Sequence, residues 1–241
     1  VVPAERNLPV FSVADIQVRK AHREYRVPIT HVPVGERKNF RMGTFPYTAE
    51  EAQNEASRCL DCDLYCSICV GVCPNMALMT YTMEPVSFDL PVVTIGGEGA
   101  SVAPGESFSV EQGYQIAVLT DFCNECGNCV TFCPTAGEPY RDKPRLYLNR
   151  DDFLSEPDNA FMLHNGAMEG RFAGETHRIE LNGSLTYENP LGTVHVDPDE
   201  FTVIDASGKD GAVLRLEAAA TMYAIMQGLR GSMPYLPVAA S

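Results

Sequence analysis

The chain has 241 residues, of which 45% are hydrophobic and 21% are charged, a composition typical of a globular protein with a buried core. Its formal net charge of −14 argues against binding to the phosphates of a nucleic acid. No apolar run approaches the roughly 20 residues that a membrane-spanning helix needs, so no membrane span is expected.

The N-terminal region predicts an arm followed by a helix. Residues 1–47 contain five prolines and little periodicity, so we expect an extended arm or linker with one short helix around residues 13–25. Thr48 is a favourable N-cap, and Glu51, three residues later, completes a capping box. The helix that begins there is expected to lead into the first of two cysteine runs.

The first cysteine run contains Cys59, Cys62, Cys66, Cys69 and Cys73. Read from Cys62, its spacing is C-x3-C-x2-C-x3-C-P. The second run contains Cys123, Cys126, Cys129 and Cys133, with the spacing C-x2-C-x2-C-x3-C-P. This second spacing is the bacterial-ferredoxin signature for a [4Fe–4S] cluster.

The rest of the chain has mainly strand patterns. Between the runs, residues 90–95 and 114–120 read as strands around a Gly- and Pro-rich stretch at 96–105. After the second run, strands are expected at residues 145–148, 193–196 and 201–204, with a hairpin at 177–188 whose Asn182-Gly183 pair predicts a type I′ turn. An amphipathic helix is expected from about Val213 to Leu229, and its Met and Tyr side chains are interpreted as core.

The spacing also predicts which thiolates share a cluster. In two-cluster ferredoxins the fourth cysteine of each run binds the other cluster. Cluster 1 would then be held by Cys62, Cys66, Cys69 and Cys133, and cluster 2 by Cys123, Cys126, Cys129 and Cys73. Eight thiolates are needed and nine are present, so one is spare. Cys59 is the expected spare, but Cys59 and Cys62 could form the ligand pair and leave Cys66 free.

Besides electron transfer through iron–sulfur clusters, the cysteines could have three other uses. Four cysteines can bind zinc, but zinc ribbons use two separated pairs and need no terminal Cys-Pro. Disulfides are not expected, because a secreted scaffold spreads an even number of cysteines through a short chain. The first residues also lack the pattern of a secretory signal, so a reducing, cytoplasmic location is expected. Alternatively, the clusters could only stabilise a docking surface in an assembly module.

Two segments resemble a known family. Residues 47–62, YTAEEAQNEASRCLDC, resemble the segment beside the FAD- and NAD(P)-binding module of oxidoreductases related to the glutamate synthase small chain. Residues 123–129 and 137–145 are similar to the C-terminal iron–sulfur region of the branch named for selenate reductase Fe–S subunits. The resemblance covers about residues 47–150. It implies a flavoprotein partner or further domain that binds FAD and NAD(P)H, and a terminal oxidoreductase such as a molybdenum hydroxylase of anaerobic metabolism.

We therefore expect an α+β protein in three parts. Residues 1–47 form the arm, and residues 48–150 form a ferredoxin-like domain with two [4Fe–4S] clusters and a β insertion at about 82–121. Residues 151–241 form a β-rich region that ends in the amphipathic helix. The expected function is one-electron transfer within a flavin-dependent oxidoreductase, with no catalytic residue in this chain. A substrate site within residues 151–241 is a further alternative, although no catalytic motif is found there.

Overall fold

The computed structural model of the protein describes residues 18, 24–58, 66–97, 99–164, 166–234 and 236. The chain divides into two compact units, Val1–Cys66 and Ser67–Ser241, and each is described by itself. Apart from Val18 and residues 24–25, the helix expected around residues 13–25 lies outside the described residues. Cys59 and Cys62 also lie outside them.

The first unit contains the predicted capping box. Helix α2 covers Ala49–Ser57; the Glu51 amide donates to Thr48 Oγ1 at 3.2 Å, and the Thr48 amide donates to the Glu51 carboxylate at 2.8 Å. Upstream, the backbone folds back on itself, because the Val32 amide donates to the Gly43 carbonyl and the Phe45 amide to the Thr30 carbonyl, both at 2.9 Å. The arm expected to be extended therefore contains a folded-back loop at residues 30–45.

The second unit is built on two sheets. The larger has nine strands in the order β1-β4-β5-β6-β7-β8-β9-β10-β11. Their bounds are β1 (Leu78–Thr82), β4 (Tyr114–Leu119), β5 (Arg145–Leu146), β6 (Ala160–Leu163), β7 (Ala167–Phe172), β8 (Glu175–Asn182), β9 (Ser184–Asn189), β10 (Gly192–Val196) and β11 (Val203–Gly208). The smaller sheet has the order β12-β2-β3, with β2 (Val86–Gly96), β3 (Gly99–Val110) and β12 (Val213–Arg215). The expected boundary near residue 150 falls inside the larger sheet, where β5 pairs in parallel with both β4 and β6.

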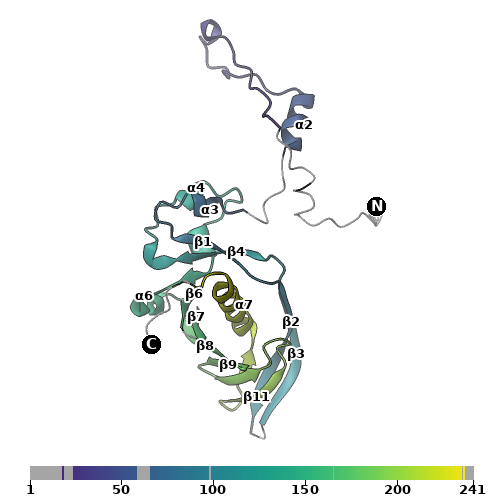
Figure 1. Cartoon of the computed structure of the whole chain (residues 1–241), viewed down its shortest axis with the longest axis vertical. Coiled ribbons are helices and arrows are strands. Elements are labelled where there is room, and N and C mark those ends of the chain that lie inside the picture. The colour runs from purple at the N-terminus through teal and green to yellow at the C-terminus, as the bar shows by residue number, and fades with distance from the viewer. Residues whose placement is uncertain are drawn as a thin grey trace, which may run out of the picture. The chain divides into compact units, whose positions relative to one another are not determined.

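The described helices of this unit are short except for the last one. They are α3 (Ile68–Gly71), η3 (Thr120–Phe122), α4 (Asn128–Thr131), α5 (Pro139–Asp142), α6 (Arg150–Ser155) and α7 (Glu217–Ser232). α7 lies between the larger sheet and the β2–β3 hairpin, and β6, β7, β8 and β9 follow one another beside it (Figure 1). Met222, Met226 and Leu229 of α7 are fully buried, so its methionines are core residues as predicted.

Two sequence predictions differ from the structure in detail. The last helix begins at Glu217 rather than Val213, because residues 213–215 pair with β2 as strand β12. The hairpin at 177–188 is present as β8 and β9, but only Gly183 of the turn has a left-handed φ, of +81°, so the turn is not type I′.

Residues 99–105 of the Gly- and Pro-rich stretch belong to strand β3, within the region where the β insertion is predicted. Pro91 of β2 pairs with Pro104 of β3 beside a shift in the register, where the ladder is irregular enough to accept proline. A Cβ atom at Gly105 would lie 2.4 Å from the Leu90 carbonyl oxygen, so the close approach of the two strands requires glycine there.

The surroundings of two glycines in α7 predict opposite effects of an alanine substitution on thermal stability. A Cβ at Gly228 would lie 2.7 Å from the Tyr81 ring of β1, whereas a Cβ at Gly231 would have no neighbour within 4 Å. We expect Gly228→Ala to lower the thermal midpoint, because overpacking costs about 1–3 kcal/mol and exceeds the gain in helix propensity. Gly231→Ala is the matched control and should leave the midpoint unchanged or raise it. Thermal unfolding of both variants checks this, and equal midpoints would contradict the packing of α7 on β1.

Candidate functional site

The two cysteine runs form the same local structure twice, 60 residues apart. Cys69 is the second residue of α3 and Cys129 is the second residue of α4, and both are buried. In each turn the amide four residues after Ser67 or Gly127 donates back to that residue's carbonyl, at 3.2 and 3.0 Å. The sequence repeat between these runs is therefore also a structural repeat, over residues 67–77 and 127–137.

Each repeat ends with an amide that donates to a cysteine sulfur. Met76 and Ala136 have left-handed φ angles of +54° and +55°, which turn the next amide back toward the preceding cysteine. The Ala77 amide donates to Cys73 Sγ at 3.3 Å, and the Gly137 amide donates to Cys133 Sγ at 3.2 Å. The bond from Gly137 helps to lower the pKa of Cys133 and so favours its thiolate form, which metal ligation needs.

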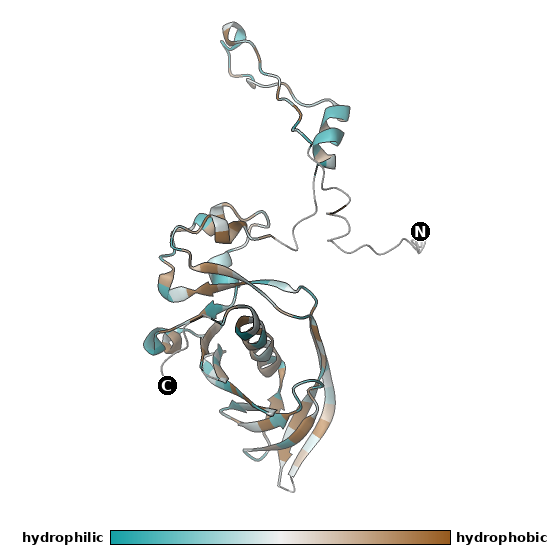
Figure 2. Ribbon diagram, in the orientation of Figure 1, coloured by the Kyte–Doolittle hydropathy of each residue, from teal (hydrophilic) through white to brown (hydrophobic). Residues whose placement is uncertain are grey.

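Strands β1 and β4 bring the two repeats together. β1 begins at Leu78, directly after the first repeat, and β4 ends shortly before the second. The strands pair antiparallel, with Leu78 opposite Val118. Leu78, Val118 and Ile116 form a hydrophobic cluster with Cys69 and Cys129, and Cys73 and Cys123 pack against it. Figure 2 shows hydrophobic residues on β1 beside the cysteine turns.

One pocket is lined by four cysteines from both runs. These are Cys73, Cys123, Cys126 and Cys129, and each of these described residues is a free thiol. Leu78, Tyr140 and the loop at 124–128 complete the lining. The four cysteines are those that the crossed-ligand rule assigns to cluster 2. Of the residues expected to hold cluster 1, Cys69 and Cys133 belong to the second unit, Cys66 closes the first unit, and Cys62 lies outside the described residues.

The loop of the second run turns its backbone toward this pocket. Glu125 and Gly127 have left-handed φ angles of +53° and +79°. Alternation of right- and left-handed residues points successive amides to one side and makes a concavity that binds anions, as found at many iron–sulfur sites. The loop lines the pocket and has two left-handed residues, as such anion-binding loops do.

The thiols of the site differ in acidity. Burial raises the pKa of Cys123, a backbone hydrogen bond from Glu125 lowers it, and the nearby thiols of Cys73 and Cys129 raise it further. The Thr135 hydroxyl, 3.3 Å away, and the Gly137 amide lower the pKa of Cys133.

Within the described part of the chain, no three His, Cys, Asp or Glu side chains form a group that could hold a metal ion.

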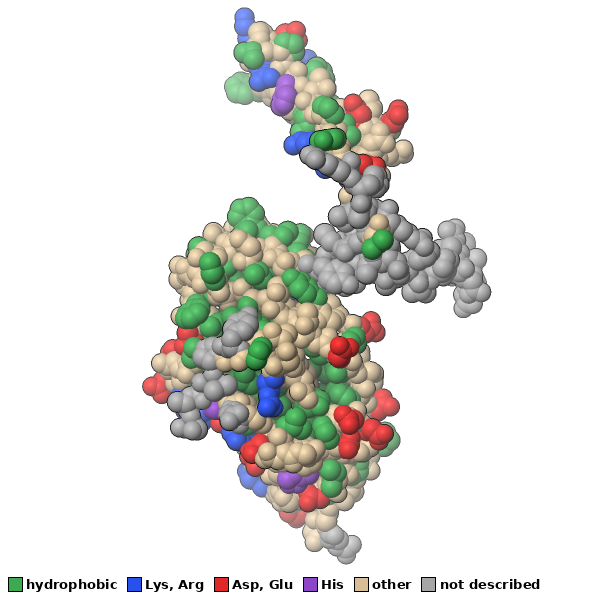
Figure 3. All heavy atoms as spheres, in the orientation of Figure 1, with side chains coloured by type: hydrophobic (Ala, Val, Ile, Leu, Met, Phe, Trp, Pro, Cys, Tyr) green, Lys and Arg blue, Asp and Glu red, His purple; other side chains and the backbone are tan. Residues whose placement is uncertain are grey.

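Exposed apolar side chains lie close to the cysteines in the chain, a feature that the sequence patterns did not predict. Ile68, Met76, Phe122 and Phe132 are between 46% and 80% exposed, and each lies within three residues of a cysteine. Figure 3 shows hydrophobic side chains gathered over the α3–α4 end of the second unit. The signal in the sequence was a cysteine segment, 66–77, without a single charged residue.

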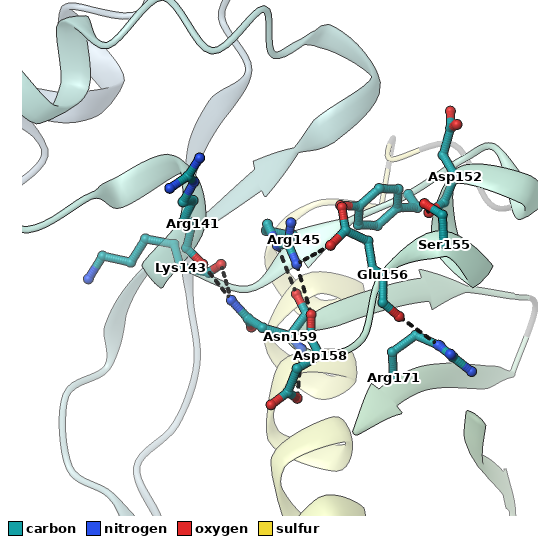
Figure 4. Close-up of polar contacts among 10 residues, drawn as sticks. Arg141, Lys143, Arg145, Asp152, Ser155, Glu156, Asp158, Asn159 and Arg171 are labelled. Atoms are coloured by element: carbon teal, nitrogen blue, oxygen red, sulfur yellow. Dashed lines mark hydrogen bonds and ion pairs between the residues drawn. The ribbon is translucent and has the colours of Figure 1, made fainter. Parts of the chain in front are cut away.

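A polar network joins the segment after Cys133 to the larger sheet (Figure 4). Asn159 donates through Nδ2 to the carbonyls of Arg141 and Lys143, at 2.7 and 2.9 Å. The Arg145 guanidinium donates to the Glu156 carboxylate at 2.9 Å and to the Asp158 carbonyl at 2.8 Å. These bonds fix the α5 end of the cysteine region to the start of β6.

Comparison with known proteins relates the chain to a protein that is named in two strains of Escherichia coli. The chain is 29% identical over 135 residues to the protein named "Putative oxidoreductase YgfK" from Escherichia coli strain K12, and it matches the protein of the same name from strain O157:H7 equally. The match covers 56% of this chain but only 11% of the length of these relatives. The chain is thus related to part of a protein named as an oxidoreductase.

The other comparisons return nothing. No family model matches the chain, and no solved structure matches it. Among the described helices, none has both the length and the apolar sequence needed to cross a membrane.

Substitution of Asn159 tests whether the polar network holds the cysteine region. Asn159→Asp keeps a residue that tolerates the observed φ of +50° but replaces two donated bonds by repulsion between oxygens. We expect a loss of about 1–3 kcal/mol in stability and faster amide exchange at residues 138–146.

Asn149→Asp is the matched control for this change. Asn149 only accepts bonds, from the amides of Asp151 and Asp152, and an aspartate accepts equally well at a helix N-cap. Hydrogen exchange measured by mass spectrometry compares the protection of the amides of residues 138–146 in the two variants. Equal protection of residues 138–146 in the two variants would contradict a fixing role for Asn159.

Proposed function

We propose that this chain is an electron-transfer component of a larger oxidoreductase and that its cysteines hold two [4Fe–4S] clusters. Cys73, Cys123, Cys126 and Cys129 would hold one cluster, and Cys62, Cys66, Cys69 and Cys133 would hold the other. A [4Fe–4S] cluster, when bound, accepts and releases single electrons. Redox function is also consistent with the relationship to a protein named as an oxidoreductase.

The single observation that carries this proposal is the pocket lined by four thiols from two runs about 50 residues apart. A cubane spreads its ligands more widely than one metal ion does, because each thiolate binds a different iron. Four thiols line the pocket, together with the side chains of Asn124, Glu125 and Asn128, and a set of four thiols suits iron–sulfur chemistry. Leu78 and Tyr140 form apolar walls beside them, and such walls limit access of water and oxygen.

The chain's own residues would set the properties of the clusters. The Ala77 and Gly137 amides donate to sulfur and would offset the negative charge of the thiolates. Burial of Cys69 and Cys129 lowers the local dielectric and works in the opposite direction. Both effects act on the reduction potential, which ranges over about −700 to +450 mV in this class of cofactor.

The place of the chain in an electron path follows from the resemblance to flavin-dependent oxidoreductases. FAD and NAD(P)H would be bound by a partner flavoprotein or a further domain, and electrons would pass through the clusters to a terminal oxidoreductase, such as a molybdenum-containing hydroxylase. The exposed side chains Ile68, Met76, Phe122 and Phe132 would lie close to the point where electrons leave or enter.

Paired cysteine variants test the ligand assignment. In protein prepared anaerobically, Cys126→Ser should retain about four irons instead of about eight and should take up one electron fewer from dithionite. Cys59→Ser is the matched control, since the spare cysteine should be replaceable without loss of iron. Iron analysis and a reductive titration measure both effects. Full iron content and undiminished electron uptake in Cys126→Ser would contradict the proposal.

A purely structural role is the second candidate, and the packing of Cys69 and Cys129 among Leu78, Ile116 and Val118 favours it. Clusters that only hold the fold need not change oxidation state. We expect instead that dithionite reduces the protein, that oxidant restores it, and that the reduced form has an electron paramagnetic resonance signal. Iron-loaded protein that cannot be reduced reversibly would favour the structural role.

A further inference from the structure

A second pocket lies away from the cysteines, between α7 and the connection from β1 to β2. Its volume is about 450 Å³, within the range of about 300–1,000 Å³ for small-molecule sites. One wall is formed by Thr82, Met83, Glu84 and Val86, and the other by Tyr223, Ala224, Gln227, Gly228 and Gly231. The residues from α7 share one face of the helix, because they recur at a helical spacing.

Two glycines of α7, Gly228 and Gly231, shape this pocket. Gly228 allows α7 to approach Tyr81 and Met83 closely, so the helix is held against β1. Three residues later Gly231 has open space where a side chain would project, so the walls diverge from this point. The pocket is therefore fixed by the contact at Gly228 and left open at Gly231.

The lining of this pocket suits a ligand with an apolar ring or chain. Met83, Val86, Ala224 and the Tyr223 ring contribute hydrophobic surface, and a methionine beside an aromatic ring is favourable for flat ligands. Gln227 donates through Nε2 to the Tyr223 hydroxyl at 2.9 Å. This bond fixes the Gln227 amide and the Tyr223 hydroxyl oxygen. The hydroxyl proton of Tyr223 can then donate to a ligand.

The charge of the pocket favours a cation. Glu84 is exposed at the rim, and among the described lining residues there is no Lys, Arg or His. α7 ends at Ser232, so Gly231 lies in its last turn, where the helix dipole attracts positive charge. The whole second unit carries 23 acidic and nine basic residues, and its field also attracts cations. Arg230, the nearest base in sequence, is exposed and does not line the pocket.

We propose that this pocket binds a small organic cation with an apolar body, of the class of the aromatic amines. The body lies between Met83 and Tyr223, and the ammonium group lies at the rim beside Glu84. We expect phosphate-bearing ligands such as dinucleotides to bind this pocket less tightly than cations, because its described lining has no basic side chain to pair with them. The site is separate from the cysteines and does not depend on the proposed electron transfer.

Two probes with the same ring and opposite charge test the ligand class. Isothermal titration of the full chain with tryptamine and with indole-3-propionate compares a cation with an anion. We expect tryptamine to bind at least about fivefold more tightly, the effect of one partly exposed charge pair. Glu84→Gln should remove most of this preference while leaving weak binding of both probes.

A substitution at Gly231 tests the location. Gly231→Leu places a side chain in the open space of the pocket and should weaken tryptamine binding by about tenfold or more. Gly231→Ala makes the same backbone change with one methyl group and should retain most of the affinity. The thermal midpoint of each variant reports whether it is folded, and Glu84→Gln, at an exposed position, tests the proposal even if Gly231→Leu does not fold.

Three results would overturn this proposal. They are no measurable binding of tryptamine to the unmodified chain, equal affinity for the cation and the anion, and unchanged tryptamine affinity in both Gly231→Leu and Glu84→Gln. None of them bears on the iron content or the electron uptake of the protein, so failure here is distinguishable from failure of the proposed electron transfer.

Discussion

The antiparallel pairing of β1 with β4 brings together two cysteine segments that are about 50 residues apart in the chain. Leu78 lies opposite Val118 in this ladder, and both side chains pack with the buried thiols Cys69 and Cys129. Without this pairing each run would be an isolated turn with too little apolar surface to fold alone. The pocket with four thiols therefore depends on a contact between strands rather than on either cysteine motif by itself.

The rest of the second unit supports that contact from two sides. At the far end of β1, Tyr81 packs against Gly228 of α7, whose buried methionines join it to β7 and β8. Beside β4, the bonds of Asn159 and Arg145 tie the α5 end of the second cysteine repeat to β6. The C-terminal region thus supports the cysteine site, and its helix α7 also forms one wall of the separate apolar pocket.

Local signals in the sequence predicted local structure well. The capping box at Thr48, the hairpin at β8 and β9, and the buried methionines of α7 agree with the patterns that predicted them. Long-range features were not predictable. The extent of β3, the pairing of β12 with β2, and the sheet that crosses residue 150 depend on contacts with other strands that the local sequence does not show. The assignment of the cysteines to two clusters, the ferredoxin-like class and the cofactors stay predictions.

The metal content of the intact chain tests the central claim most directly. Protein prepared without oxygen should contain about eight irons and about eight acid-labile sulfides per chain and no stoichiometric zinc. Stoichiometric zinc, or far fewer than eight irons with no sulfide, would contradict the account, because the thiols that meet across β1 and β4 would then serve another chemistry.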